Sequence, residues 1–183
     1  MLLNQLLRPF GYLVIRHPYK WVVDWFYPTV LSVVAVVLAA LAGDITKVIT
    51  PGGMISLALS FIQSLPGFYI AALAAIATFG RADIDSILPE PTPRIKNRVR
   101  NTDNWVALTR RRFLAMLFAF LTAESILLIL YSICLLSYGP LAASLAYGTA
   151  LITALVFIYF LLLFQMIAAT FWGLYYLGYK LHE

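Results

Sequence analysis

Four long apolar stretches constrain the fold of this chain more than any other feature. They lie at about residues 21–42, 54–79, 113–137 and 141–167, and each is long enough for a helix to cross a bilayer, which takes about 20 residues. Of the 183 residues, 62% are hydrophobic and 11% are charged, whereas soluble domains are about 25% charged. We therefore predict an all-α integral membrane protein, in which residues 1–183 form a single domain of four transmembrane helices.

The distribution of Lys and Arg predicts how the helices are oriented. Three cations precede the first stretch, eight lie in the loop at 80–112 and one lies in the tail at 168–183, whereas Lys47 is the only one on the other side. Cytoplasmic segments carry the excess of Lys and Arg. We therefore expect both termini and the long loop to face the cytoplasm.

Smaller features refine this picture of the membrane domain. Residues Leu2, Leu3, Leu6, Leu7 and Phe10 predict a short amphipathic segment at the N-terminus. Asp24, near the start of the first stretch, is expected at headgroup level. The third and fourth stretches are joined by little more than YGP at 138–140, which predicts a tight antiparallel turn there.

The second stretch contains the sequence SLPGF, which interrupts a helix. Pro66 cannot donate a hydrogen bond to the carbonyl of Ile62, and Gly67 adds flexibility, so we expect a kink. The kink is either a static bend or a hinge used in signalling. Small residues also recur at every fourth position in each stretch, as in Ala35-Ala39-Gly43. Such rows let helices approach closely and predict a tight bundle that forms a homo-oligomer.

Glu124 is a carboxylate inside the third apolar stretch. It lies twelve residues after Arg112, about 18 Å along a helix, which places it near the bilayer centre. An ionised carboxylate there costs at least about 2.5 kcal/mol, and no Lys or Arg lies in any of the four stretches. We expect a protonated carboxyl, hydrogen-bonded to the carbonyl freed by Pro66 or to one of the polar groups at similar depth: Ser32, Ser64 and Thr153, with Gln63 nearby. Its role is structural, sensory or part of a proton path.

The loop at 80–112 is the longest polar segment of the chain. Pro89, Pro91 and Pro93 alternate and predict an extended, stiff stretch. Its cations are expected to bind anionic lipid or a cytosolic protein partner, and they are Arg94, Lys96, Arg98, Arg100, Arg110, Arg111 and Arg112. Direct nucleic-acid binding is not expected, because interleaved aromatic residues are missing. Thr102 or Asp103 is expected to cap a helix that runs through Trp105 into the third stretch.

Chemical motifs are missing from the sequence. It has one cysteine, two histidines without an accompanying carboxylate cluster, and no phosphate-binding glycine loop with a lysine motif. We therefore predict neither an enzyme nor a metal or cofactor site.

The chain resembles the KwaA family, the membrane subunits of the Kiwa anti-phage defence system. The resemblance covers the whole chain and rests on its layout and on SLPGFYIAALAAIATF, RADIDSILPEPTP and LTRRRFLAMLFAFL. It implies a homo-oligomeric inner-membrane sensor of phage attachment or envelope disturbance that acts with KwaB, a cytosolic DNA-binding effector. The loop and the tail would then be docking surfaces. Two alternatives stay open: a prophage superinfection-exclusion or membrane-permeabilising protein, and a small proton-linked transporter.

Overall fold

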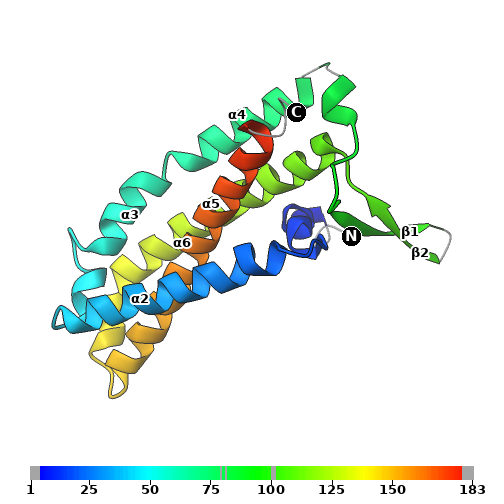
Figure 1. Ribbon diagram of the computed structural model, residues 1–183. Coiled ribbons are helices and arrows are strands. Elements are labelled where there is room, and N and C mark those ends of the chain that lie inside the picture. The colour runs from blue at the N-terminus through cyan, green and yellow to red at the C-terminus, as the bar shows by residue number, and fades with distance from the viewer. Residues whose placement is uncertain (1–4, 79, 81, 100–101, 179–183) are drawn as a thin grey trace.

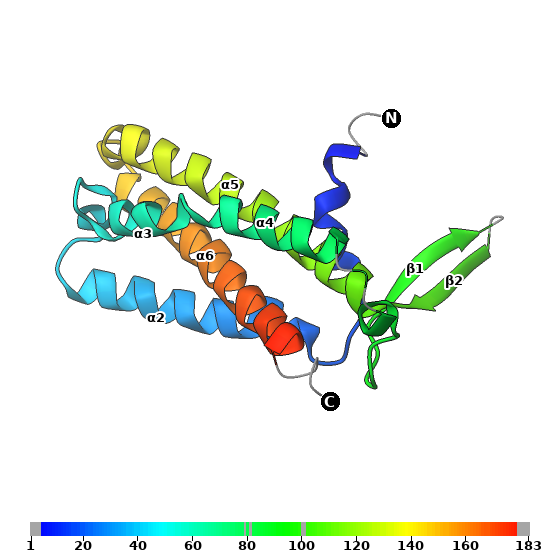
Figure 2. The ribbon, with the colours of Figure 1, turned by 90° about the horizontal axis from the view of Figure 1, so that it is seen from above.

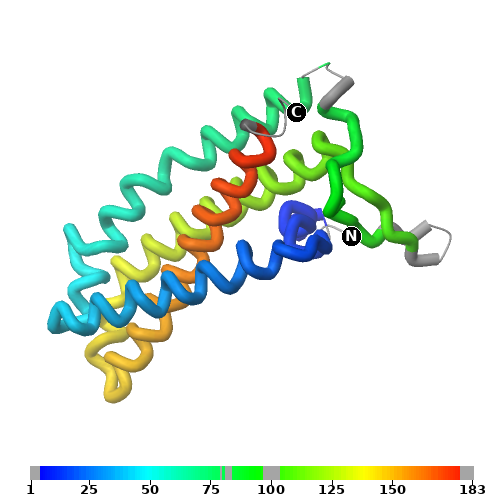
Figure 3. Tube along the Cα trace, in the orientation of Figure 1, coloured from blue at the N-terminus to red at the C-terminus, as the bar shows by residue number. Residues whose placement is uncertain are grey.

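The computed structural model describes residues 5–78, 80, 82–99 and 102–178 as an elongated bundle of helices with a small β-hairpin at one end (Figures 1 and 3). Four helical spans in these residues are long and apolar enough to cross a membrane. They are Val22–Leu41, Ile45–Thr78, Arg110–Ala143 and Gly148–Leu177. The prediction of a four-span membrane protein is therefore confirmed in its helices, although the hairpin adds a strand pair to the expected all-α fold.

The elements follow one another in a simple up-and-down order. The helices of the bundle are η2 (Val22–Phe26, a π-helical turn), α2 (Tyr27–Leu41), α3 (Met54–Ile62), α4 (Leu65–Thr78), α5 (Arg110–Ala143) and α6 (Gly148–Gly178). Short 3-10 helices occur at η1 (Arg8–Val14), η3 (Ile45–Ile49) and η4 (Ala82–Asp85). The hairpin consists of β1 (Arg94–Val99) and β2 (Thr102–Ala107).

Helix α5 forms the centre of the bundle and contacts α3, α4, α6 and η1. In the most apolar 18-residue segment of α5 half of the residues are buried, whereas in the corresponding segment of the first span 22% are buried. Close approach to α6 depends on Gly173, where an added Cβ would lie 2.6 Å from Leu117 Cδ2. Farther along, the Tyr131 hydroxyl donates a 2.8 Å hydrogen bond to the carbonyl of Leu155. The remaining helix faces are rich in exposed apolar side chains, as expected where lipid is the solvent.

The second span is broken where the kink was expected. Helix α3 ends at Ile62 and α4 begins at Leu65, so the interruption falls at Gln63 and Ser64, one residue before Pro66 is reached. Pro66 therefore occupies the first turn of α4, where a proline costs no helical hydrogen bond. Whether Pro66 and Gly67 also act as a hinge stays a prediction.

The turn between the third and fourth spans is not at YGP. Helix α5 continues through Gly139 and Pro140 to Ala143, and the chain reverses between Ser144 and Tyr147. Gly139 packs against η3, since an added Cβ would lie 2.6 Å from Ile49 Cδ1. Pro140 removes one hydrogen bond from the helix. The packing of Gly139 against Ile49 opposes this loss, so the helix can continue past the proline. The Ser144 hydroxyl then donates to the Leu141 carbonyl at 2.7 Å and helps to end the helix.

The loop between α4 and α5 is partly a β-hairpin, so the predicted helix from Thr102 or Asp103 is wrong. Strands β1 and β2 pair antiparallel, with Arg94 opposite Ala107 and Val99 opposite Thr102. The N-cap of α5 is Thr109, whose hydroxyl accepts a hydrogen bond from the N–H of Arg112. Figure 2 shows the hairpin projecting from the end of the bundle. The described chain also begins and ends near this end, which we call the hairpin end.

The segment before the first span packs against α5. Tyr12 of η1 is fully buried and stacks on Phe120 with 4.9 Å between ring centroids. Phe10 meets the same ring edge-on at 6.1 Å. Leu6 and Leu7 are exposed, while Leu2 and Leu3 lie outside the described residues. The N-terminal segment is therefore amphipathic in its described part, with its aromatic side attached to the protein.

Candidate functional site

Glu124 is buried in the bundle without a hydrogen-bond partner. Its side chain is 4% exposed, and neither carboxyl oxygen is hydrogen-bonded to any described residue. The expected partners donate instead to carbonyls of their own helices: Ser32 to Pro28, Ser64 to Phe61 and Thr153 to Thr149. Gln63 is exposed at the break between α3 and α4. The predicted hydrogen bonds to these hydroxyls are therefore wrong, because a local carbonyl satisfies each one.

Glu124 is the fifteenth of the 34 residues of α5, slightly on the hairpin side of the middle of this helix. It is close enough to interact electrostatically with Asp24, the third residue of the first span, and with Tyr12 of η1. Gln165 of α6 is another polar side chain that is buried, at 3% exposed, and its amide nitrogen has no hydrogen-bond partner in the described chain. The expected depth of Glu124 near the bilayer centre stays a prediction.

A second buried carboxylate, Asp24, is fully paired. The Tyr12 hydroxyl donates a 3.0 Å hydrogen bond to Oδ1, and the Lys20 ammonium forms an ion pair with Oδ2. The Lys20 ammonium also lies 4.1 Å from the centroid of the Tyr12 ring. Burial raises the pKa of Tyr12 and lowers the pKa of Lys20. Asp24 is 1% exposed, so it belongs to a buried polar cluster, and its expected depth at the headgroups stays a prediction.

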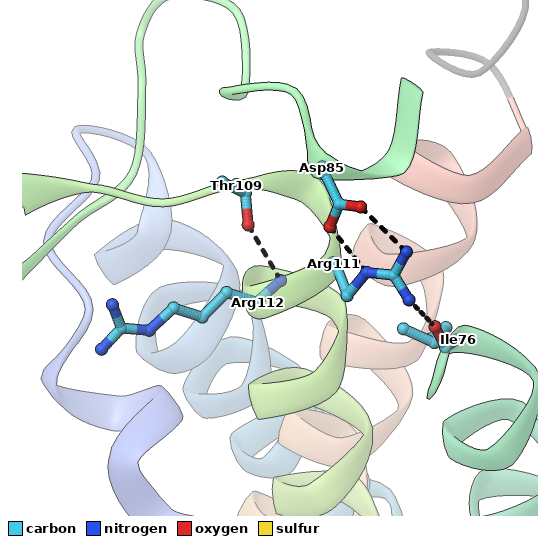
Figure 4. Close-up of polar contacts among 5 residues, drawn as sticks. All are labelled: Ile76, Asp85, Thr109, Arg111 and Arg112. Carbon is cyan, nitrogen blue, oxygen red and sulfur yellow. Dashed lines mark hydrogen bonds and ion pairs between the residues drawn. The ribbon is translucent and has the colours of Figure 1, made fainter. Parts of the chain in front are cut away.

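Arg111 joins three segments at the hairpin end (Figure 4). Its Nε and Nη2 donate to the two carboxylate oxygens of Asp85 in η4 at 2.7 and 3.0 Å, and its Nη1 donates to the Ile76 carbonyl in α4 at 2.7 Å. These bonds from Arg111 hold the pKa of Asp85 below its usual range. Arg111 was grouped with the lipid- or partner-binding cations, but its contacts here fix the end of α4 to the start of α5.

The neighbouring arginines differ from Arg111. Arg112 is exposed and its side chain points away from the Asp85 contact (Figure 4). Arg110 is half-buried, and its Nε has no hydrogen-bond partner among the described residues. The cation-rich segment therefore contains arginines in three different environments.

The hairpin carries the remaining predicted cations. Arg94 and Lys96 are exposed on β1. Arg98 alternates with them along the strand, although its side chain, like Arg100, lies outside the described part. Of the three prolines, Pro93 is buried and its carbonyl accepts a 3.0 Å hydrogen bond from the N–H of Leu108. Pro89 and Pro91 are exposed in an irregular segment.

The N-terminal segment holds the hairpin in place, which sequence reasoning missed. Arg16 and Arg94 exchange two backbone hydrogen bonds, of 2.9 and 3.0 Å. The Arg16 guanidinium lies 4.6 Å from the centroid of the Trp105 ring. On the other side, the N–H of Arg110 donates to the Ser86 carbonyl at 3.0 Å. The hairpin is therefore attached firmly to the bundle. Within the described residues, no group of three His, Cys, Asp or Glu side chains could hold a metal ion.

Comparison of this chain with protein families, with curated proteins and with solved structures found no match in any of the three.

Proposed function

We propose that this protein is a non-enzymatic inner-membrane sensor and scaffold in anti-phage defence, which detects envelope disturbance or phage attachment and recruits a cytosolic effector. The resemblance to the KwaA family supports this role. In this proposal the hairpin end faces the cytoplasm, because the cations of the loop and of the N-terminal segment gather there, whereas Lys47 lies in η3 at the opposite end.

One observation carries the proposal: the β-hairpin projects from the bundle and carries cations, yet it is not needed to cross a membrane (Figure 2). Backbone hydrogen bonds join Arg94 of β1 to Arg16 in the segment before the first span, and join Arg110 at the start of α5 to Ser86 in the segment before the hairpin. Arg94 and Lys96 are exposed on β1, and Arg98 follows in the sequence at the same two-residue spacing. Such an element can present charge to a partner and transmit a movement of the helices to it.

Recruitment is tested by reversing charges on the hairpin. We expect K96E/R98E/R100E to insert normally but to lose co-purification of the effector, which is identified by co-purification with the wild-type chain from its native host. Arg94 is left unchanged because it also lines the groove described below. The control is R8E/R112E, which reverses two exposed cations at the same end but away from the hairpin.

The results separate the docking surface from the role itself. Retention of the effector by the triple variant would reject the hairpin as the docking surface. If the effector failed to co-purify with the wild-type chain, and phage plated equally well with and without the pair, the recruiting role would be rejected.

A second candidate, a small proton-linked transporter, is favoured by one observation. Glu124 is buried and its carboxyl oxygens are unpaired among the described residues, as expected of a group that gains and loses a proton. Proton flux into vesicles containing the purified protein, compared with E124Q, tests this candidate. Equal flux for the two proteins and for empty vesicles would reject it.

A further inference from the structure

A groove of about 810 Å³ lies at the hairpin end, between the N-terminal segment, the start of the first span and the hairpin. Three cations, Arg16, Lys20 and Arg94, lie along it. Three tryptophans, Trp21, Trp25 and Trp105, also line it. The groove therefore combines positive charge with large aromatic side chains, and segments distant in the sequence build it together.

The two arginines carry the positive charge that is available to a ligand. The carboxylates in the lining are Asp24 and Glu90, and Asp24 is already paired with Lys20 and Tyr12. Arg16 and Arg94 are exposed and, in the described chain, neither forms an ion pair. His17 adds no charge at neutral pH, because burial lowers its pKa. An anion in the groove would therefore meet two guanidinium groups and a single unpaired carboxylate.

The backbones of the two arginines are held together by hydrogen bonds. Arg16 and Arg94 face each other in an isolated antiparallel bridge. The Arg16 side chain is further held against the face of Trp105 at 4.6 Å, which restricts its motion without using a carboxylate. Paired arginines that are fixed in this way suit the oxygens of a phosphate group, which accept several N–H donors at once.

The position of two tryptophans suits the groove to the depth of the phosphate groups of a bilayer. Trp21 and Trp25 flank the start of the first span at Val22, and they are 64% and 44% exposed. Tryptophans in this position mark the boundary between headgroups and acyl chains. A ligand in the groove can therefore keep its phosphate beside the arginines and its apolar part beside these tryptophans.

We propose that this groove binds the phosphate group of an anionic phospholipid, with Arg16 and Arg94 as the residues that contact it. Trp105 positions Arg16, and Trp21 and Trp25 contact the glycerol and the first acyl carbons. The inference rests on the four membrane-spanning helices and not on recruitment of an effector. Failure of one proposal therefore leaves the other standing.

The test uses the purified full-length chain in vesicles that contain brominated phosphatidylglycerol or brominated phosphatidylcholine, with tryptophan fluorescence as the readout. Bromine quenches a tryptophan only on contact, so competition between the two lipids gives their relative affinity. An arginine near the membrane surface contributes about fivefold in affinity for anionic lipid. Two arginines together contribute up to about 25-fold, and the carboxylate of Glu90 in the lining offsets part of this. We therefore expect the wild-type chain to prefer phosphatidylglycerol by about tenfold, and R16Q/R94Q to show about twofold or less.

The control variant is R8Q/K96Q, which removes the same charge from the same end outside the groove lining and is expected to keep the wild-type preference. Equal quenching of the wild-type chain by both lipids would overturn the proposal, as would equal preferences for R16Q/R94Q and the control. If R16Q/R94Q fails to fold, the salt dependence of the wild-type chain tests the proposal instead. We expect its preference for phosphatidylglycerol to fall between 0.05 and 0.5 M salt, roughly as expected from charge screening. A preference that does not change with salt would overturn the proposal.

A further arm adds inorganic phosphate to the wild-type chain at constant ionic strength. Unchanged lipid preference supports a membrane-derived ligand. Displacement of phosphatidylglycerol by phosphate would reject the lipid and assign the groove to a soluble phosphorylated molecule.

Discussion

Asp24 and Glu124 are both almost inaccessible, at 1% and 4% exposed, but only Asp24 has hydrogen-bond partners among the described residues. The Lys20–Asp24 pair follows an i, i+4 spacing that can be read from the sequence. Its third member, Tyr12, cannot be read in the same way, because it depends on η1 folding back against α5. An unpaired buried carboxyl such as Glu124 opposes folding, so its presence points to a role other than stability.

Replacing Glu124 by leucine is expected to stabilise the protein. E124L removes a buried polar group without hydrogen-bond partners and fills a similar volume, so we expect a gain of about 1–3 kcal/mol. Thermal unfolding of the purified protein in detergent measures this gain. The control E124Q keeps an unpaired polar group and should change stability little. Lower stability of E124L would contradict the burial of an unpaired carboxyl.

Asp85 predicts an acid-sensitive contact at the hairpin end. Arg111 lowers the pKa of Asp85 in the folded protein, so the pair stabilises the fold above the unfolded value of about 3.9. This contribution is lost as the pH falls through the folded pKa. We expect amide-exchange protection at 82–85 to decrease below about pH 4, after correction for intrinsic rates. D85N should show the low protection at neutral pH already; equal protection of D85N and wild type would reject the contact.

At the scale of elements, the long helices could be predicted and their connections could not. Four apolar runs suffice to place the spans, because a helix is the simplest structure that satisfies its backbone in lipid. The turn after α5 escaped prediction because a proline in the sequence does not show whether neighbouring packing lets the helix continue. The hairpin had a detectable signal: Ile95 and Val99 alternate with Arg94, Lys96 and Arg98. The density of cations drew attention to charge instead.

The stability of the protein is expected to respond oppositely to alanine at Gly67 in α4 and at Gly148, the first residue of α6. A Cβ at Gly148 would lie 2.1 Å from the Ala143 carbonyl oxygen, so G148A should destabilise the protein by about 1–3 kcal/mol. A Cβ at Gly67 meets nothing within 4 Å, so G67A should be neutral or stabilising by up to about 1 kcal/mol. Thermal unfolding in detergent compares the two. Equal losses would contradict the tight turn at Gly148.

At the scale of the whole molecule, the ends of the bundle differ. The hairpin, the Tyr12–Lys20–Asp24 cluster and the Arg111 contacts gather at one end, while η3 and the α5–α6 turn lie at the other (Figure 1). Sequence reasoning located the cations but did not show how they differ: one group binds the fold together, and another lines the groove.

The proposed orientation is tested with single cysteines in a C134S background. K96C should react with a membrane-impermeant maleimide in inside-out vesicles, and K47C should react in right-side-out vesicles, because these positions lie at opposite ends of the bundle. The reverse pattern would place the hairpin outside the cell and reject recruitment of a cytosolic effector.

Helix α5 has a geometric consequence for the hairpin attached to its first turn. Its 34 residues extend for about 51 Å, whereas the hydrocarbon layer is about 30 Å thick. The helix must therefore tilt or extend into the aqueous phase. When the bilayer thins or is stretched, the preferred tilt increases. We expect Thr109 and the preceding strands β1 and β2 to move with the helix as its tilt changes. A change in bilayer thickness would then displace the hairpin outside the membrane.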